Sequence, residues 1–272
     1  MAANYWESSQ FQRFLLTRYE LAEIENTHML QYLSAADVTH LKIFFANLML
    51  KIGKRIRARQ EIIATAIVYF KRFYINNSLS DIDPYLMVAT CMYLASKVEE
   101  SPHHIKYIWG ESKAAFAGKF KTKKVSSEIK FNYDIADIAE CESYLLEEMK
   151  FYLVVYHPYQ VLIDINEQIK LPKASLQAAW SIINDSFRTD LILVYPPHVI
   201  ALASLFLSRV VDQGELSELE AQQWFADLNV DVTDILQVVN EMVALYSTWK
   251  SYAENKMPDM VSRFISELDA AV

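Results

Sequence analysis

The stretch MYLASKVEES, residues 92–101, decides the fold because it closes a run without a charged residue that begins at Pro84. A helix that is apolar on nearly all sides is buried in the centre of a bundle. Asp83 and Pro84 favour a helix start, with the aspartate as N-cap and the proline in the first turn. Gln60–Tyr74 is also apolar on most sides. The sequence therefore predicts two central helices, and it raises the question of why the second one ends on Lys97 and two glutamates.

The composition supports an all-α fold. The chain has 272 residues, 53% of them hydrophobic, with only 4 Gly and 7 Pro. That glycine and proline content is below average usage and indicates few turns. A net charge of −8 and a pI near 5.3 argue against a nucleic-acid backbone as the main partner, because such a partner selects a basic face.

No catalytic or metal-binding pattern is present in the sequence. It lacks a phosphate-cradling glycine loop, HExxH, CxxC and G-x-S-x-G. Cys91 and Cys141 both fall within apolar helical patterns and are interpreted as core residues of a reducing compartment. The longest uncharged run, 191–208, contains two prolines and a histidine, unlike a membrane span. We expect a soluble intracellular protein without catalytic residues, metal or cofactor.

Helical periodicity continues along the rest of the chain. We expect Gly53 to end the helix that contains Leu41 and Ile52. The lysine-rich segment Glu111–Lys130 is predicted to be an exposed loop with a short helix. The remaining helices are expected at Asn4–Leu16, Asp134–Met149, Tyr159–Ile169, Lys173–Leu191, Pro197–Asp212, Ser217–Asp227, Val232–Tyr252 and Pro258–Leu268.

The two halves of the chain are weakly alike. A shift of 112 residues places the run 84–97 over 196–209, and both runs are apolar and begin with proline. A duplicated helical unit explains this similarity. Chance similarity between two buried helices is the alternative.

Glu142 lies in the middle of an apolar helix face. At about 100° per residue, Ile138, Leu145 and Met149 cluster on that face, with Glu142 among them. A carboxylate there needs a partner. Lys97 is the natural one, and such a pair at the edge of an apolar patch suits a protein interface. The alternatives are a solvated Glu142, or a salt bridge that contributes at most about 1 kcal/mol.

The motifs taken together resemble the cyclin family. They are ATAIVYFKRFY (64–74), LASKVEE (94–100) and ECESYLLEEMKFYLVVYHPY (140–159) for a first cyclin box, and AWSIINDSFRTDLILVYPPHVIALASL (179–205) for a second. NYWESSQFQRFLL (4–16) is similar to the amino-terminal helix of the cyclin C group, in the transcriptional branch. The resemblance implies two five-helix boxes, at 34–155 and 156–252, an N-terminal helix and linker at 1–33, and a C-terminal helix at 253–272.

The resemblance also implies how such a protein acts. Lys97 and Glu142 match positions that hydrogen-bond the kinase beside its C-helix. The apolar residues expected to press on the kinase are Val98, Leu146, Phe151 and Leu153. Binding then holds the C-helix inward, so that its glutamate pairs with the ATP-site lysine and the activation segment is ordered. The implied protein is therefore a regulator without activity of its own.

Two further sites are weaker expectations. Arg55, Arg57 and Arg59 belong, together with Lys51 and Lys54, to a basic run. This run is either a solvated turn or a contact to acidic groups on the kinase activation segment. The second set consists of residues close together on one predicted helix: Trp180, Asn184, Asp185 and Arg188. These residues either belong to the core or line a groove between the boxes that receives another Mediator subunit.

The implied partners are a Mediator-associated cyclin-dependent kinase and other subunits of the Mediator kinase module, in the nucleus. No direct nucleic-acid or membrane contact is expected. The alternatives are a cyclin of the H, T or K type with a different transcriptional kinase, a helical factor of the TFIIB type, and a scaffold without a kinase partner.

Overall fold

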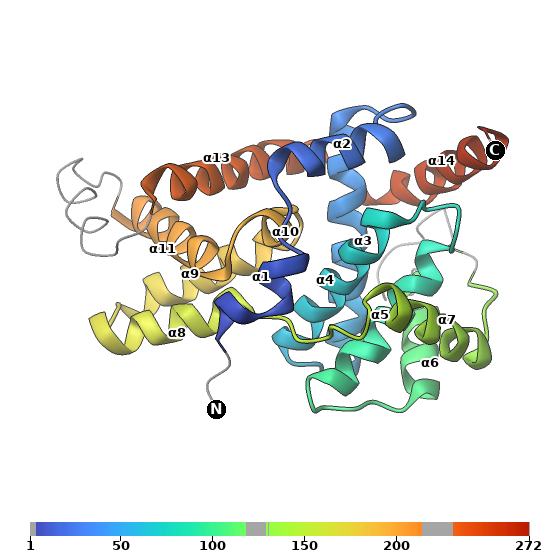
Figure 1. The fold of residues 1–272 in the computed structure, drawn as a ribbon, viewed down its shortest axis with the longest axis horizontal. Helices are drawn as coiled ribbons and strands as arrows, with labels where there is room; N and C mark the ends of the chain where they lie inside the picture. Colours follow the sequence, from blue (N-terminus) through green and yellow to red (C-terminus); the bar gives the residue numbers. More distant parts are fainter. Residues whose placement is uncertain (1–3, 118–128, 130, 214–230, 272) are drawn as a thin grey trace. The chain divides into compact units, whose positions relative to one another are not determined.

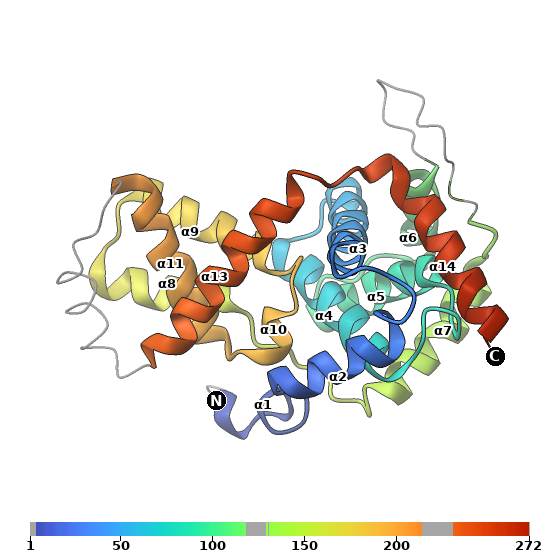
Figure 2. The same cartoon turned by 90° about the horizontal axis from the view of Figure 1, so that it is seen from above.

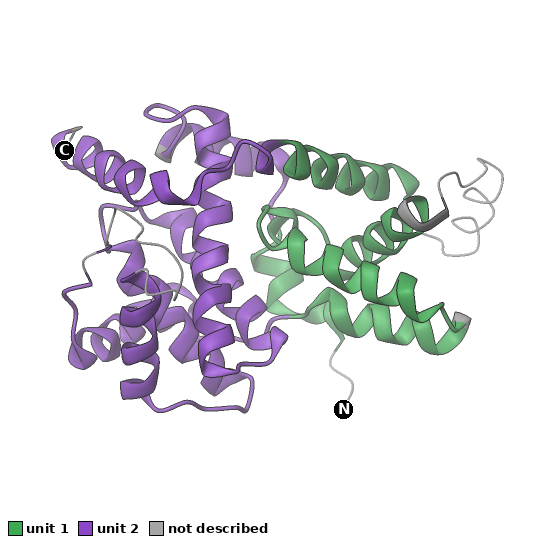
Figure 3. Cartoon of the chain, turned by 180° about the vertical axis from the view of Figure 1, so that it is seen from behind, with its two compact units in different colours: residues 1–15, 156–247 green, residues 16–155, 248–272 purple. Residues whose placement is uncertain are grey.

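The computed structural model describes residues 4–117, 129, 131–213 and 231–271, and within these ranges it is helical without a β-strand (Figure 1). The chain divides into two compact units, coloured separately in Figure 3. Unit 1 comprises residues 1–15 and 156–247, and unit 2 comprises residues 16–155 and 248–272. The assignment of two cyclin boxes at 34–155 and 156–252 stays a prediction.

Unit 2 is built around three long helices. These are α3 (Ala35–Ile56), α4 (Gln60–Asn76) and α5 (Pro84–Val98). Figure 2 looks along α3 and shows α4, α5 and α6 (Ile105–Phe116) around it. Further helices of this unit are α2 (Arg18–His28), α7 (Ile135–Glu148), η2 (Glu254–Lys256) and α14 (Met257–Ala271).

The two helices predicted to be central are indeed buried. In α4, every residue from Ile62 to Phe70 is buried, and in α5 so are Met87 to Met92 and Leu94 to Ser96. The Asp83 side chain accepts a hydrogen bond from the Tyr85 N–H at 2.7 Å, so α5 begins as the sequence predicted. The apolar residues on all faces of these helices therefore form the core of unit 2.

Gly53 does not end α3, contrary to the prediction. The helix continues to Ile56, and Arg57 follows in the left-handed region with φ 56°. A Cβ on Gly53 would meet the Ile63 side chain, with Cγ1 at 2.5 Å. This glycine therefore permits the close approach of α3 and α4 rather than a helix end.

The segment Glu111–Lys130 was predicted to be an exposed loop with a short helix; residues 111–116 are indeed helical, but they are not exposed on all sides. Helix α6 extends to Phe116, and it buries Ile108, Ser112, Ala115 and Phe116 on one side. This spacing is helical, but the buried serine interrupts the apolar pattern and conceals it. Most of the remaining part of that prediction, 118–130, and all of the predicted helix 217–227 lie outside the described residues.

Unit 1 consists of the N-terminal segment and the second half of the chain. Its elements are η1 (Tyr5–Glu7), α1 (Ser9–Arg13), α8 (Pro158–Ile169), α9 (Lys173–Ser186), α10 (Leu191–Val194), α11 (Pro197–Gln213) and most of α13 (Val232–Trp249). The buried Gln10 side chain accepts from the Tyr156 N–H at 2.7 Å and donates to the Tyr156 carbonyl at 3.3 Å. This pair of bonds fixes α1 to the start of the second half.

Candidate partner-binding site around Lys97 and Glu142

The end of α5 places Lys97 at the surface. The Ser101 N–H donates to the Ser96 carbonyl at 3.0 Å, and the Glu100 N–H donates to the Lys97 carbonyl at 3.3 Å. Glu100 lies in the left-handed region with φ 52°. These features define a Schellman motif, which satisfies the last carbonyls of a helix and stops it. Helix α5 therefore ends just after Lys97 and Val98, where the apolar run gives way to solvent.

Lys97 on α5 forms an ion pair with Glu142 on α7, as the sequence predicted. Glu142 Oε1 is buried, and the lysine ammonium is the partner that it meets. The two side chains are unequally exposed, at 38% for Lys97 and 14% for Glu142. Lys97 Nζ also lies 4.4 Å from the centre of the Tyr93 ring. The alternative of a fully solvated Glu142 is therefore wrong, and the lysine keeps part of its surface available.

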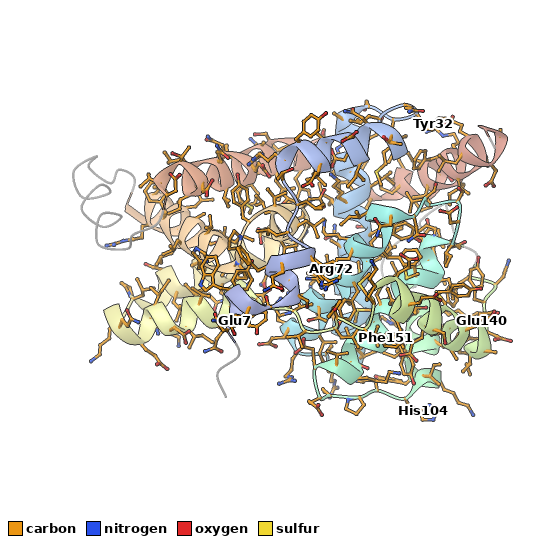
Figure 4. All side chains as sticks on the ribbon, in the orientation of Figure 1. Glu7, Tyr32, Arg72, His104, Glu140 and Phe151 are labelled. Carbon is orange, nitrogen blue, oxygen red and sulfur yellow. The ribbon has the colours of Figure 1, made fainter. Side chains whose placement is uncertain are left out.

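The end of α7 presents an aromatic side chain to solvent. Lys150 and Phe151 both have positive φ angles, 49° and 59°. Each such non-glycine residue costs roughly 1–2 kcal/mol relative to a right-handed conformation. Phe151 is 71% exposed (labelled in Figure 4), so burial within this chain does not offset that cost. An exposed phenylalanine in a strained backbone is typical of a surface that a partner covers.

The segment after Phe151 is held in place by a hydrogen bond from the core of unit 2. The buried Tyr69 donates its hydroxyl hydrogen to the Leu153 carbonyl, and burial raises the pKa of that hydroxyl well above its ordinary range. Val98, Leu146 and Leu153 are each partly exposed. They keep apolar surface available near the ends of α5 and α7.

Val154 is a surface residue that the sequence analysis did not single out. It is 61% exposed and directly follows Leu153. The run of apolar letters from 151 to 155 contained the signal, but an apolar run alone does not say which side chains face outward.

The basic run is largely tied to other parts of unit 2. Arg55 Nε lies 2.5 Å from Glu111 Oε2, and Lys51 pairs with Glu254. Arg59 donates to the Glu99 carbonyl at 2.5 Å. Arg57, in contrast, is exposed. The interpretation as a merely solvated turn therefore fits only part of the run.

The predicted set on α9 and just beyond it is brought together within unit 1. The ring of Trp180 lies 4.6 Å from that of Tyr159, whose hydroxyl donates to Asn184 Oδ1 at 2.8 Å. Asp185 accepts from Arg188 Nη1 at 2.8 Å, and the Tyr246 hydroxyl donates to its other oxygen at 3.1 Å. Burial raises the pKa of Asp185, and Arg188 opposes that rise. The proposed role of this set in a groove between the boxes stays a prediction.

The described part of the chain lacks the features of a metal centre and of a membrane-spanning helix. Within it, no group of three or more His, Cys, Asp or Glu side chains is arranged to hold a metal ion. No described helix is both long and apolar enough to cross a membrane. Cys91 and Cys141 are buried free thiols, and burial raises the pKa of each, in agreement with the prediction that they are core residues.

The fold and this site define an all-α protein that carries a candidate partner-binding face. The family model of the cyclin N-terminal domain matches residues 14–154, more than half of the chain. The chain belongs to the cyclin family.

Relatives place the chain within that family. Cyclin-C of Rattus norvegicus is 42% identical over 258 residues, covering 94% of this chain and 87% of that protein. Cyclin-C of Drosophila melanogaster is 38% identical, with coverage of 98% and 97%. The RNA polymerase II holoenzyme cyclin-like subunit of Yarrowia lipolytica is 35% identical, with coverage of 98% and 100%. The chain is therefore a cyclin C homologue.

Solved structures confirm the fold. A chain of the CAK complex of Chaetomium thermophilum matches with a TM-score of 0.67 at 22% identity, covering 96% of this chain and 88% of that one. A chain of the yeast TFIIK (Kin28/Ccl1/Tfb3) complex matches with a TM-score of 0.64 at 23% identity, covering 89% and 99%. Cyclins are non-catalytic regulatory subunits, and the homology implies a cyclin-dependent kinase as partner.

Proposed function

We propose that this chain is the regulatory subunit of a Mediator-associated cyclin-dependent kinase that acts in RNA polymerase II transcription in the nucleus. The identities of 35–42% with cyclin C proteins and with an RNA polymerase II holoenzyme subunit support this proposal over a partner of the CAK or TFIIK type. The likeness to those two complexes lies below 25% identity and concerns the fold alone.

The observation that carries the proposal is the Lys97–Glu142 ion pair beside exposed apolar surface. An ion pair with one half-solvated cation has unused hydrogen-bond donors on the lysine and an acceptor on the glutamate. A kinase segment that lies across it can bond to both through its backbone. Val98, Leu146 and Phe151 then supply apolar contact area around these polar bonds, the usual arrangement of a protein interface.

The proposed action is allosteric. The face formed by α5 and the end of α7 presses on the kinase C-helix and holds it inward, so that the C-helix glutamate pairs with the ATP-site lysine. Leu153 adds to the pressing surface, and its carbonyl bond to Tyr69 fixes its position. A rigid surface is needed for this action, because a mobile one would not favour a single position of the C-helix.

Two further contacts belong to the same proposal. Arg55, Arg57 and Arg59 lie at the turn between α3 and α4, and we assign them to acidic groups on the kinase activation segment. The set around Trp180 and Asp185 is assigned to another subunit of the Mediator kinase module.

Co-purification tests the proposal. A tagged chain is recovered from cell extract, the bound proteins are identified by mass spectrometry, and the eluate is assayed for kinase activity. The test variant is Lys97→Ala/Glu142→Ala. The matched control is Lys42→Ala/Glu25→Ala, which removes another ion pair of unit 2 with side chains 22% and 24% exposed.

The expected result is a kinase and Mediator subunits in the eluates of the original chain and the control, and their loss from the test variant when that variant remains folded. Equal recovery with both variants would place the interface elsewhere. A kinase with TFIIK-type subunits would replace the Mediator assignment, and no kinase in any eluate would overturn the regulatory function.

A further inference from the structure

Two turns of unit 2 that are distant in sequence are tied together. His103 Nε2 lies 3.2 Å from the Ile56 carbonyl oxygen, and the Tyr107 hydroxyl donates to the Arg55 carbonyl at 3.3 Å. The rings of His103 and Tyr107 are stacked, with centroids 6.2 Å apart. These contacts hold the start of α6 against the end of α3, so exposed residues of the two segments lie in the same region of unit 2. His104 in Figure 4 marks the turn before α6.

The two segments that these contacts join carry several basic residues. Lys54, Arg57 and Arg59 come from the end of α3 and the following turn, and Lys106 comes from the first turn of α6. We call these four residues the basic surface; each of them is exposed. Among the described residues, none of the four forms an ion pair. They therefore combine high local positive charge with available donors.

The neighbouring charges do not cancel the basic surface. Arg55 and Lys51 are each engaged by a glutamate of their own, so those two pairs are locally neutral. The carboxylates that remain nearby in sequence are Glu61, Glu99 and Glu100, which bring three negative charges against the four positive charges of the basic surface. A net positive surface thus persists in a chain whose total charge is −8.

We infer that the basic surface binds a phosphorylated segment of a partner protein. A phosphoserine or phosphothreonine carries close to two negative charges and three acceptor oxygens. Two arginine forks and two lysines supply several charge-assisted donors for such a group, whereas a single carboxylate offers fewer acceptors and half the charge. Because the ties are internal to unit 2, the two segments that carry these side chains are held together before a ligand arrives.

The inference deepens the activation-segment contact proposed above and rests on it only for the source of the phosphate. We assign the phosphate to the kinase activation segment, and a separate phosphoprotein is the outcome of the second arm below that would overturn this assignment. Binding of the phosphate itself is a property of this chain, and it does not require the Lys97–Glu142 face.

The test measures fluorescence anisotropy with the full-length chain. The probe is a fluorescein-labelled peptide of glycine and serine that carries two phosphoserines. Its comparison peptides carry unmodified serine or glutamate at the same two positions. The test variant is Lys54→Gln/Arg57→Gly/Lys106→Gln. Glycine suits position 57 because φ is positive there, and Arg59 is retained because it bonds to the Glu99 carbonyl.

The matched control variant is Lys170→Gly/Lys256→Gln/Arg263→Gln. It removes the same number of positive charges from exposed sites, and Lys170 also has a positive φ, 48°. General loss of charge and the change to glycine are therefore equal in the two variants.

Of the three peptides, only the phosphopeptide is expected to bind to the original chain. Its affinity is expected to fall at least about tenfold in the test variant and to stay unchanged in the control, because the loss of one charge-assisted hydrogen bond is sufficient for a tenfold change. Equal binding of the unmodified or glutamate peptide, equal loss in the control, or no binding by the original chain would overturn the inference.

A second arm separates the inference from the proposed function. Lys97→Ala/Glu142→Ala is expected to bind the phosphopeptide as the original chain does, even if kinase binding fails. Purified kinase that displaces the phosphopeptide would identify the activation segment as the source of the phosphate, whereas joint binding would identify a separate protein. Loss of phosphopeptide binding in this folded variant would contradict the assigned surface.

Discussion

Removing either partner of the Lys97–Glu142 pair is expected to affect kinase binding far more than folding. The two deletions are not equivalent, because the two side chains are 38% and 14% exposed. Lys97→Ala leaves a largely buried carboxylate without its cation. Glu142→Ala leaves a lysine that is still solvated and still lies over the Tyr93 ring.

The effect on stability follows from this difference. A pair with one exposed partner contributes about 0–1 kcal/mol to the free energy of unfolding. Glu142→Ala is therefore expected to cost no more than about 1 kcal/mol. Lys97→Ala is expected to cost somewhat more, since an uncompensated buried carboxylate remains. Both costs are small against a stability of about 5–15 kcal/mol for a folded domain.

The effect on binding is expected to be larger, because in the proposed complex the kinase removes the remaining solvent from the pair. Truncating one partner of a desolvated, hydrogen-bonded charge pair at an interface costs about 2–5 kcal/mol. At about 1.4 kcal/mol per tenfold change, the dissociation constant is expected to rise by roughly 30-fold to a few thousand-fold. A double-mutant cycle is expected to show strong coupling between the two positions.

Isothermal titration calorimetry with the purified kinase measures the dissociation constants, and urea unfolding measures stability. Lys42→Ala and Glu25→Ala serve as controls, since they break an ion pair between α3 and α2. The reasoning would be refuted by folded Lys97→Ala and Glu142→Ala variants that bind the kinase normally. An equal loss of affinity in the control variants would refute it as well.

Three other predictions follow from the fold. Gly53→Ala is expected to lower the free energy of unfolding by about 1–3 kcal/mol, because the added Cβ overlaps the Ile63 side chain. Ile63→Ala should relieve much of that loss in the double variant, and additive costs in urea unfolding would contradict this explanation. Phe151→Asn is expected to leave stability unchanged or raise it by up to about 1 kcal/mol, since asparagine tolerates a positive φ angle. Its affinity for the kinase is expected to fall on the order of tenfold, and a loss of stability without a loss of affinity would contradict the interface role. Burial lowers the pKa of His198 below 6.5, so the unfolded chain binds this proton at a higher pH than the folded chain does, and stability should fall as the pH drops below about 6.5. Thermal unfolding of His198→Gln should lack that part of the pH dependence, and an unchanged pH profile would contradict this prediction.

The ion pair was predictable because a single carboxylate interrupted an otherwise apolar helix face. Local periodicity fixes which residues share a face, and burial physics then requires a partner for Glu142. The central position of α4 and α5 was predictable for a similar reason, since apolar residues on all sides leave no face for solvent.

Features that depend on contacts between distant residues were not predictable. Gly53 was expected to end a helix, because nothing in the neighbouring sequence reveals that Ile63 approaches it. The ties from His103 and Tyr107 to the end of α3 join residues about fifty positions apart, and no local pattern encodes them. The exposure of Phe151 likewise depends on the backbone conformation after α7 and not on its apolar character.

The most direct test of the central claim is activation of the purified Mediator-associated kinase by this chain. The initial phosphorylation rate is measured while the original chain, or Lys97→Ala/Glu142→Ala, is titrated into the kinase. The account predicts a saturable rise in rate with the original chain, and for the variant a half-saturating concentration at least roughly 30-fold higher. No activation by the original chain, or equal activation by a folded variant, would contradict it.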